Sequence, residues 1–522
     1  MVWPSIQTAA HSAQPAIPVE AVPLVDNPHK EPDCEPDCDP DYDLAIIGGG
    51  INGSGIANDA AGRGLKVALI ERDDLAQATS SASTKLIHGG LRYLEYYAFR
   101  LVREALQERE VLSNKAPHLV RPLRLVIPHN GQRPAWIVRL GLWLYDHLAA
   151  HPNFLPAWAL DLSKSPQGAP LRGEFRKAFE FSDATVDDAR LVIANALQAA
   201  ERGAHVFTRS EVTDAVRQTD HWLISRTNGP DITARALVNA TGPWVRDTLE
   251  AFERPGPGVR LVQGSHIVVP KMYEGAQAYL LQQDDGRVVF VIPYQGVFSL
   301  IGTTEVLLEE TGDAASVSEA EIQYLIAAVD RHFVKAPVAD DIVWRFAGIR
   351  PLFDEDDDDP KAFSREYHLH LDADDGPALL SVYGGKITTY RRLAEKVLDR
   401  LKPYLPAHGP AWTATTPLPG GENCPQLNTD LQLPDGLLAD LTARHGSLVA
   451  AVLGDCRKVA DLGICFGGNL YAREIDHFMD REWACTGEDV MWRRSKSGLV
   501  LDAEQRTRVE QYVADRLALR QV

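Results

Sequence analysis

The spacing of hydrophobic residues changes along the chain and divides it into strand-like and helix-like segments. A short apolar run at 44–47 leads into a glycine-rich stretch, which is followed by a helix-like pattern and a second apolar run at 66–70. Short apolar runs are typical of buried strands, and longer stretches with a period near 3.6 are typical of helices. The order strand, helix, strand predicts a parallel β-α-β unit at the start of the folded chain.

The middle of the chain mixes both patterns. Helical spacing predicts amphipathic helices at 97–114 and 187–203. Strand-like runs follow at 205–209, 222–226 and 235–243. Between about 258 and 350, runs that alternate or cluster β-branched residues predict an antiparallel sheet.

The two ends of the chain differ from this middle part. Residues 1–40 are rich in proline and acidic residues, which predicts a disordered tail. Beyond Pro417 the pattern is helical with few strand signals. We therefore expect both α/β and α+β structure, divided into the tail at 1–40, a large domain at 41–410 and a C-terminal helical domain at 411–522.

Composition narrows the class of protein. Of the 522 residues, 45% are hydrophobic and 24% are charged, which is ordinary for a globular chain. The net charge of −19 argues against a nucleic-acid partner, because nucleic acid favours a basic surface. The six cysteines are too few for a disulfide scaffold and fit a reducing compartment. No apolar run is long enough for a transmembrane helix, and no signal peptide is recognisable, so we expect neither.

We also expect no metal site. Cys34 and Cys38 lie in the predicted tail and make only half of a thiolate site. The acidic run at 354–359 is interpreted as a solvated loop, and His368 and His370 as structural residues of a strand.

The glycine-rich stretch carries the most specific chemistry. Gly48, Gly50 and Gly53 form a G-x-G-x-x-G motif between the two predicted strands, and Glu71 ends the second strand. In such a motif the first glycine allows a tight turn, the second lets the backbone approach a pyrophosphate, and the third lets helix pack on strand. Glu71 can accept hydrogen bonds from a ribose. The motif predicts dinucleotide binding but does not distinguish FAD from NAD, because both contain the ADP half.

Two further turns favour FAD. The sequence VNATG at 238–242 ends a predicted strand, and YGGKITTY at 383–390 places a glycine pair before a helix. Turns at the same edge of one sheet gather around one ligand. The helix after Gly385 can direct its N-terminal N–H groups toward the electron-rich pyrimidine ring of a flavin.

With these segments the sequence resembles the FAD-dependent glycerol-3-phosphate dehydrogenases of aerobic respiration. The resemblance runs from about residue 42 to the C-terminus, through ATSSASTKLIHGGLRYLE, FEFSDATVDDARLV, VNATGPWV, QGSHIVVP, VFVIPY, IGTTE, AGIRPL, GGKITTYRRLAEK and VMWRRSKSGL. It implies a D-amino-acid-oxidase-like fold, in which a Rossmann-like FAD-binding domain is interleaved with an antiparallel-sheet substrate domain and followed by the helical domain.

The resemblance also implies an activity. Non-covalently bound FAD would take electrons from sn-glycerol 3-phosphate, yielding dihydroxyacetone phosphate, and pass them to a membrane quinone. We therefore expect a cytoplasmic protein that attaches peripherally to the cytoplasmic face of the inner membrane. A homodimer is the assembly that we consider.

The chemistry needs a base for the C2 hydroxyl and cations for the phosphate. His266 is the candidate base, since an imidazole titrates near neutral pH; the alternative is a hydrogen-bonded core histidine. Arg350 and Lys386 are the candidate catalytic cations and, with Arg92 and Tyr93, would bind substrate; each cation alone could equally be a surface charge. The cofactor contacts implied by the resemblance are Gly48, Gly50, Gly53, Glu71, Ser80, Ser81, Ser83, Thr84, His88, Thr241, Gly242, Gly385 and Thr388.

The apolar helical stretch at 134–149 allows two interpretations. Its mixture of aliphatic residues with Trp136, Trp143 and Tyr145, and with Arg139 between them, fits a helix lying in a membrane interface, and it also fits a buried core helix. A lipid-soluble quinone acceptor favours the first interpretation.

Other functions remain open at this stage. A glycerol-3-phosphate oxidase would return electrons to oxygen, and an amine or amino-acid oxidase of the same fold would bind a carboxylate in place of the phosphate. A non-catalytic flavoprotein sensor is disfavoured by the combination of a candidate base with three cations.

Overall fold

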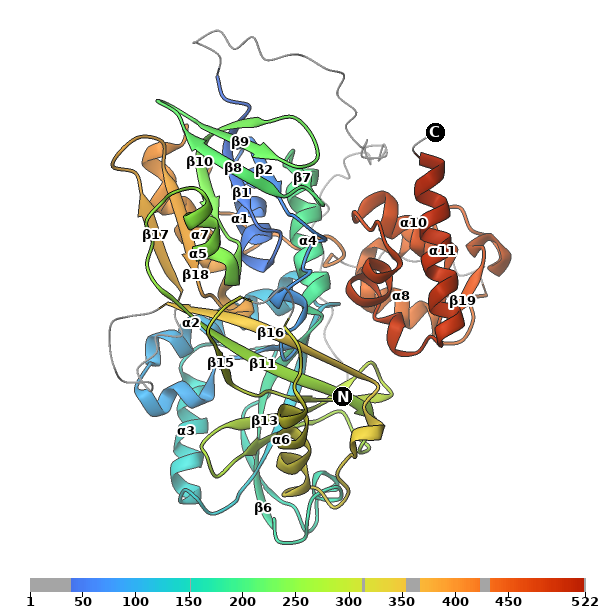
Figure 1. The fold of residues 1–522 in the computed structure, drawn as a ribbon. Coiled ribbons are helices and arrows are strands. Elements are labelled where there is room, and N and C mark those ends of the chain that lie inside the picture. Colours follow the sequence, from blue (N-terminus) through green and yellow to red (C-terminus); the bar gives the residue numbers. More distant parts are fainter. Residues whose placement is uncertain (1–38, 151, 312–314, 354–366, 423–431, 521–522) are drawn as a thin grey trace, which may run out of the picture.

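The computed structural model describes residues 39–150, 152–311, 315–353, 367–422 and 432–520. Two large β-sheets and a C-terminal group of helices make up this part of the chain (Figure 1). Most of the predicted tail, with Cys34 and Cys38, and the acidic run at 354–359 lie outside the described residues. No helix within the described ranges has the length and apolar character needed to cross a membrane.

The first sheet is built around the predicted β-α-β unit. Its strands follow the order β17, β18, β10, β1, β2, β7, and the hairpin β8–β9 extends from β10. The pairs from β18 to β7 along this order are parallel, whereas β17 runs antiparallel at the edge. The strands are β1 (Tyr42–Ile47), β2 (Val67–Ile70), β7 (His205–Phe207), β8 (Val212–Arg217), β9 (Trp222–Arg226), β10 (Ile232–Asn239), β17 (His368–Asp372) and β18 (Leu379–Tyr383).

Both faces of this sheet are covered. Successive side chains of a strand point to opposite faces, so Leu44 and Ile46 of β1 join an apolar core with helices on one side. Ala45 and Ile47 join a second core with the β8–β9 hairpin and α5 (Val245–Ala251) on the other side. The helices of the first side are α1 (Ile51–Gly62), α4 (Asp188–Glu201) and α7 (Tyr390–Leu401).

The second sheet is largely antiparallel, as predicted for the middle of the chain. Its strands follow the order β15, β11, β14, β13, β12, β4, β6, β3, with β16 paired to β11 and β5 paired to β6. Helices α2, α3 and α6 lie against it (Figure 1). The elements are β3 (Leu86–Ile87), α2 (Phe99–Lys115), β4 (Val120–Pro128), α3 (Ala135–His147), β5 (Trp158–Asp161), β6 (Lys177–Val186), β11 (Val259–Pro270), β12 (Ala278–Gln282), β13 (Val288–Tyr294), β14 (Phe298–Gly302), β15 (Val306–Leu308), α6 (Glu319–Asp330) and β16 (Trp344–Phe353).

The chain passes repeatedly between the two sheets, which confirms the interleaved arrangement. The first sheet takes strands from 42–70, 205–239 and 368–383, and the second takes them from 86–186 and 259–353. The helix predicted at 97–114 begins two residues later, because Tyr97 has a left-handed backbone (φ 57°) that ends a preceding 3-10 turn. The helix predicted at 187–203 begins after Asp187, whose side chain caps it by accepting a hydrogen bond from the Arg190 backbone N–H.

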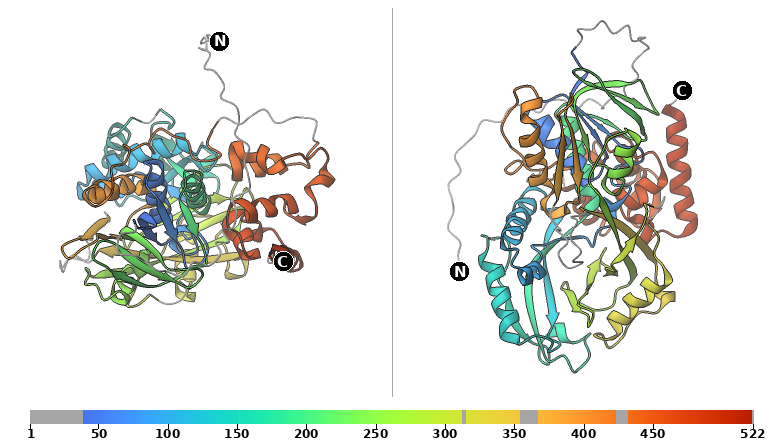
Figure 2. Two further views of the ribbon diagram at one scale, coloured as in Figure 1. Left: turned by 90° about the horizontal axis from the view of Figure 1, so that it is seen from above. Right: turned by 60° about the vertical axis from the view of Figure 1, so that its left-hand side comes forward.

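The C-terminal helices pack beside α4 (Figures 1 and 2). They form two apolar clusters of their own. Ion pairs connect them to loops that follow β2 and β7 of the first sheet: Arg494 pairs with Asp74, and Arg209 Nη2 lies 2.7 Å from Asp489 Oδ2. The elements are α8 (Leu437–His445), α9 (Val449–Leu453), β19 (Cys465–Gly467), β20 (Leu470–Tyr471), α10 (Ala472–Arg481) and α11 (Ala503–Arg520).

Candidate active site

The glycine motif forms a tight loop between β1 and the N-terminus of α1. Gly48 has φ +110°, and a Cβ there would lie 2.5 Å from the Ala240 carbonyl oxygen, so no other residue fits without displacement. A Cβ at Gly53 would lie 1.9 Å from the Gly48 carbonyl oxygen, so this glycine permits the close contact of helix with loop. Gly50 caps the helix and has only the Ser80 side chain near its Cβ position. The glycines thus keep side chains of their own away from the N-terminus of α1, which is where a phosphate binds in such motifs.

Glu71 lies at the end of β2, next to the glycine loop. Its carboxylate accepts hydrogen bonds from the backbone N–H groups of Gly49 (2.6 Å) and Asp73 (2.9 Å). Burial raises the pKa of the Glu71 carboxyl above its ordinary value. The guanidinium of Arg72 stacks on the Trp244 ring, with 4.2 Å from Cζ to the ring centroid. This pair was not predicted, and it lies beside the carboxylate expected to hold a ribose.

The two turns predicted to join the glycine loop do so. Ala240, in the VNATG turn, donates its backbone N–H to the Ile47 carbonyl (2.9 Å), and Thr241 Oγ1 donates to Asn239 Oδ1 (2.7 Å). Asn52, in the first turn of α1, donates through Nδ2 to the Gly384 carbonyl (3.1 Å). Its Oδ1 is buried and has no hydrogen-bond partner among the described residues.

These features fit an extended dinucleotide. Three glycine-containing loops meet at one edge of the sheet. Gly242 and Gly385 have φ of +63° and +100°, a backbone conformation that favours glycine. Gly385 would place a Cβ 2.9 Å from Asn52 Nδ2, so the third loop can approach α1 only as glycine. The residues therefore fit an extended dinucleotide such as FAD.

Residues 79–93 connect this cradle to the second sheet. Ser80 Oγ accepts a hydrogen bond from the Ile51 backbone N–H at the start of α1 (2.9 Å). Thr79 Oγ1 donates to the carbonyl of Ile349 in β16 (2.7 Å). His88 and Thr388 are hydrogen bonded through the His88 backbone and the Thr388 hydroxyl (3.3 and 3.4 Å). We call residues 79–93 the connecting segment.

His266 lies on β11, directly beside the connecting segment. Its Nε2 is hydrogen bonded to Thr84 Oγ1 (2.9 Å), and its ring stacks on Phe346 with 4.9 Å between centroids. Nδ1 is buried and has no partner among the described residues. Burial, together with the nearby charges of Lys85 and Arg350, holds the pKa of His266 well below its ordinary value. The ring is therefore neutral at pH 7, which is the form that accepts a proton.

Arg350 lies on β16, which pairs with β11. A Cβ at Gly264 would lie 2.6 Å from Arg350 Nη2, so the absence of a side chain at Gly264 lets the guanidinium rest on the β11 backbone. Arg350 Nη1 is 3.8 Å from Glu305 Oε1, and the Arg350 side chain is 37% exposed. The guanidinium is thus held close to His266 while keeping access to a ligand.

Lys386 lies in the Gly385 turn and contacts the other end of the connecting segment. Its Nζ is 3.9 Å from the centroid of the Tyr93 ring. Tyr93 and Arg92 lie in a 3-10 turn (Leu91–Tyr96) that begins after Gly90, and all three side chains are partly exposed. The connecting segment therefore contacts His266 through Thr84 and contacts Lys386 through Tyr93.

Two of the serines expected to contact the cofactor also form hydrogen bonds within the protein. Ser83 donates its hydroxyl to Asp188 Oδ2 (2.7 Å), and Ser81 Oγ donates to the Ala78 carbonyl (3.2 Å). Asp188 also pairs with Lys85, whose Nζ lies 2.6 Å from the same oxygen. Sequence reasoning missed this buried ion pair, which anchors the connecting segment to the first turn of α4.

Helix α3 presents an apolar row to solvent, so the buried-core interpretation of 134–149 is wrong. Trp136, Leu140 and Trp143 are 67%, 54% and 55% exposed. On the opposite side of the helix Tyr145 is buried, donates its hydroxyl to Asp183 Oδ1 (2.6 Å) and accepts the Gly89 backbone N–H (2.9 Å). Helix α3 therefore carries the exposed row on one side and contacts the connecting segment, at Gly89, on the other side.

Comparison with known proteins gives concordant matches. The family model described as FAD dependent oxidoreductase matches residues 43–391. The chain is 52% identical to a glycerol-3-phosphate dehydrogenase of Pseudomonas aeruginosa, with 90% of this chain and 95% of the relative covered. It is 48% identical to a D-erythritol 1-phosphate dehydrogenase of Brucella abortus (89% and 96% covered) and 46% identical to an aerobic glycerol-3-phosphate dehydrogenase of Escherichia coli (91% and 97% covered).

One solved structure is similar over nearly the whole chain. It is a glycerol-3-phosphate dehydrogenase from Bacillus halodurans complexed with FAD, with a TM-score of 0.67 and 25% sequence identity. The similarity covers 91% of this chain and 94% of that one.

Proposed function

The chain belongs to the FAD dependent oxidoreductase family, and on that premise we propose that it oxidises sn-glycerol 3-phosphate to dihydroxyacetone phosphate. The observation that carries the proposal is the connecting segment, which joins the dinucleotide cradle at Ser80 to His266 at Thr84 and to Lys386 at Tyr93. High identity to two glycerol-3-phosphate dehydrogenases over about nine tenths of the chain supports the same substrate.

The residues have distinct tasks in this reaction. FAD, when bound, supplies the two-electron acceptor for the hydrogen on C2. Arg350, Lys386 and Arg92 bind the phosphate dianion and fix the distance between phosphate and C2. His266, neutral and close to Arg350, accepts the proton of the C2 hydroxyl. Phe346 and Thr84 hold the imidazole in place while it does so.

A second substrate is D-erythritol 1-phosphate. The relative of that name is 48% identical to this chain, which lies between the identities of the two glycerol-3-phosphate dehydrogenases. Both substrates are phosphorylated polyols with a secondary hydroxyl, so the same base and the same cations serve either one. The length of the polyol is the property on which they differ.

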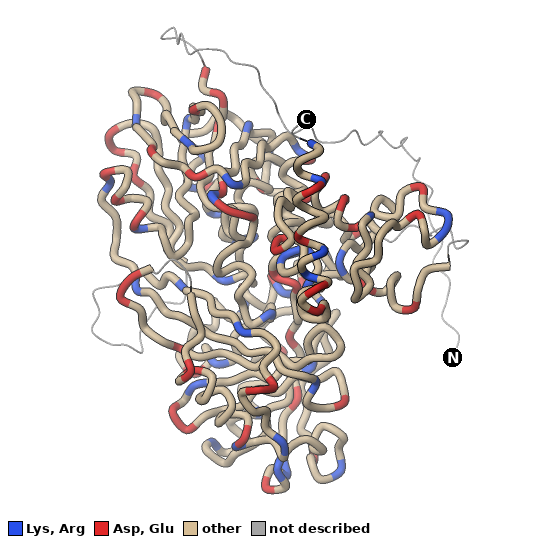
Figure 3. The backbone as a smooth tube through the Cα atoms, turned by 45° about the vertical axis from the view of Figure 1, so that its right-hand side comes forward, with Lys and Arg blue, Asp and Glu red and all other residues tan. Residues whose placement is uncertain are grey.

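The electron acceptor is proposed to be a membrane quinone. The exposed apolar row of α3 supports membrane attachment, since Trp and Leu side chains on one helix face insert into a lipid interface. Figure 3 shows acidic and basic residues interspersed along the backbone, and the net charge is −19, so we expect attachment to depend on the apolar row rather than on electrostatic attraction to anionic lipid. The protein would then lie at the cytoplasmic face of the inner membrane. Dimerisation stays a prediction.

The substrate is tested by anaerobic mixing of the FAD-loaded protein with sn-glycerol 3-phosphate, D-erythritol 1-phosphate or free glycerol, while flavin absorbance is followed. A charged hydrogen bond to phosphate contributes about 1.5–3 kcal/mol, so free glycerol should bleach the flavin far more slowly than glycerol 3-phosphate. Faster bleaching by the erythritol ester would assign the second substrate. If neither ester bleaches the flavin, the proposed function is wrong.

The acceptor is tested separately with substrate-reduced protein. Fast reoxidation by a quinone with little peroxide under air supports the dehydrogenase. Stoichiometric peroxide release under air, without quinone, would identify an oxidase.

A further inference from the structure

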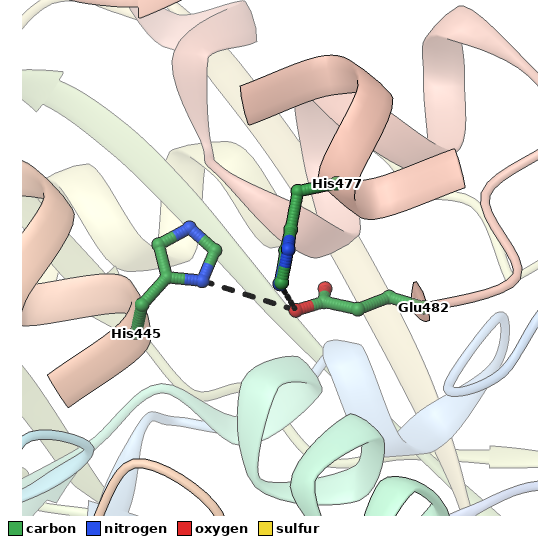
Figure 4. Close-up of side chains that lie close together, drawn as sticks. All are labelled: His445, His477 and Glu482. Carbon is green, nitrogen blue, oxygen red and sulfur yellow. Dashed lines mark ion pairs between the residues drawn. The ribbon is translucent and has the colours of Figure 1, made fainter. Parts of the chain in front are cut away.

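Three side chains of the C-terminal helices converge at the junction with α4. His445 ends α8, His477 lies on α10, and Glu482 follows α10 directly. One nitrogen of each histidine and one carboxylate oxygen lie within 4.8 Å of one another (Figure 4). His445 Nδ1 is 3.9 Å and His477 Nε2 is 3.7 Å from Glu482 Oε1. The cluster is remote in sequence from every residue assigned to the reaction above.

The atoms that converge are buried and lack ordinary partners. The side chains of His445 and Glu482 are 0% exposed, and that of His477 is 14% exposed. Neither Glu482 Oε1 nor His477 Nε2 has a hydrogen-bond partner within the described part of the chain. A buried polar atom without a partner costs free energy, and a buried carboxylate oxygen costs more than a neutral group. Two such atoms facing each other indicate that something binds between them.

The tautomer of His445 makes its Nδ1, the third of the three converging atoms, a suitable ligand. Its Nε2 lies 2.8 Å from Glu474 Oε1, and a carboxylate only accepts, so this nitrogen carries the proton. Nδ1 then has a free lone pair, which at present accepts only a long hydrogen bond from Arg190 Nη2 (3.5 Å). A histidine fixed by a carboxylate on one nitrogen, with the other nitrogen bare, is the arrangement found around protein-bound metals.

The surrounding charges are balanced. Arg444 forms two hydrogen bonds with Glu474 (2.6 and 2.9 Å). Arg190, on α4, pairs with Oε2 of Glu482 and leaves Oε1 unpaired. Each guanidinium is thus matched by one carboxylate, and no net positive charge from these four groups opposes a cation.

We propose that His445 Nδ1, His477 Nε2 and Glu482 Oε1 bind a divalent transition-metal ion, and that zinc is the ion they suit best. Two imidazoles and one carboxylate form a known zinc ligand set, and a solvent molecule completes the tetrahedron. Ligand atoms on tetrahedral zinc are separated by about 3.4 Å, which follows from metal–ligand distances of about 2.1 Å. The two separations from Glu482 Oε1, 3.7 and 3.9 Å, need only a small contraction, and the two histidine nitrogens, which lie within 4.8 Å of each other, need a larger one. The ion would fasten α8 to α10 and, through Arg190, hold both against helix α4 of the first sheet.

The first test measures metal content. The full-length FAD-loaded protein is stripped with a chelator, dialysed against buffered zinc at micromolar free concentration and analysed for bound metal and for thermal stability. We expect about one zinc per chain and a Tm that rises with zinc. Less than a tenth of an equivalent of bound zinc in the wild type, with no change in Tm, would overturn the proposal.

The second test compares variants. His477→Ala removes one ligand, and His221→Ala is the matched control, because His221 lies in the β8–β9 turn beside Asp220. Loss of a direct ligand should weaken zinc binding by more than the 10- to 100-fold that is typical for outer partners of a metal, and it should abolish the zinc-dependent rise in Tm. The control should bind zinc like the wild type.

Folding of the variants is checked by their FAD absorbance. If His477→Ala loses FAD, His477→Gln, which keeps a polar side chain of similar reach, replaces it in the comparison. Equal zinc affinity in the wild type and in a folded His477 variant would show that zinc binds elsewhere, and the proposed site would be wrong.

Discussion

Thr84 Oγ1 and His266 Nε2 are hydrogen bonded at 2.9 Å across 182 residues of sequence. Thr84 belongs to the same segment as Ser80, which contacts the N-terminus of α1. The imidazole on the second sheet is therefore oriented by the segment that also touches the dinucleotide cradle on the first sheet. A change at Thr84 should affect the reaction without reaching the phosphate cations.

Replacing Thr84 by Val keeps the shape of the side chain and removes the hydroxyl. A neutral hydrogen bond contributes about 0.5–1.5 kcal/mol, so we expect flavin reduction by glycerol 3-phosphate to slow by roughly 2- to 10-fold, with unchanged FAD content. Rapid mixing under anaerobic conditions measures this rate. Thr84→Ser retains the hydroxyl and should react at nearly the wild-type rate; equal rates for Thr84→Val and the wild type would remove Thr84 from the orientation of His266.

Arg350→Ala tests the phosphate site. The guanidinium rests against Gly264, and the Arg350 side chain is 37% exposed. We expect the KM for glycerol 3-phosphate to rise about 10- to 100-fold, the effect of one charged hydrogen bond. The slow reaction of free glycerol should change much less, since glycerol has no phosphate and loses only the effect of the Arg350 charge on the pKa of His266. A parallel loss for both substrates would mean that Arg350 supports the fold or the base instead.

The apolar row of α3 gives a prediction about the membrane. Replacing Leu140 and Trp143 by Asp places two charges on the exposed face and leaves the buried Tyr145 untouched. We expect less binding to lipid vesicles and slower quinone reduction in membranes, whereas flavin reduction by substrate should persist. Leu438→Asp, at an exposed leucine of α8, is the control. A double variant that still binds vesicles like this control would exclude α3 as the attachment surface.

His118 gives a prediction about pH. Burial and the nearby charges of Arg190 and His445 lower the pKa of His118 from about 6.5 to about 3. The unfolded chain therefore binds a proton below about pH 6.5 that the folded protein does not bind, and the free energy of unfolding falls as the pH falls from about 6.5 toward 3. One proton corresponds to about 1.4 kcal/mol per pH unit.

We expect His118→Gln to reduce this acid-side slope by up to that amount. Urea unfolding of the wild type and the variant at several pH values between 5 and 7.5 measures both slopes. Identical slopes would show that His118 is not the group that binds this proton in the unfolded chain.

The cradle was predictable from the sequence because its constraints are local. Gly48, Gly50 and Gly53 are required by one turn and one helix start, and their spacing between two apolar runs identifies them. The meeting of the Gly385 turn with α1 also followed, because ends of parallel strands share an edge of the sheet.

The contacts that organise the catalytic side were not predictable in the same way. Lys85 and Asp188 are 103 residues apart, and neither has a local pattern that marks it as a partner of the other. The direction that α3 faces depends on what packs against it, and the apolar residues Leu142 and Trp143 look alike in sequence although one is buried and the other is exposed. The cluster of His445, His477 and Glu482 was not predicted from the sequence for the same reason, since its members are brought together by the packing of α8 on α10.

The central claim is that His266 takes the C2 proton of a phosphorylated polyol while the flavin is reduced, and His266→Ala tests it most directly. The variant is mixed anaerobically with glycerol 3-phosphate, and flavin bleaching is followed; reoxidation of chemically reduced protein by quinone is measured in parallel. General-base catalysis contributes about 10²- to 10⁴-fold, so flavin reduction should slow by that factor, with FAD content and reoxidation unchanged. Flavin reduction at the wild-type rate in FAD-loaded His266→Ala would contradict the account.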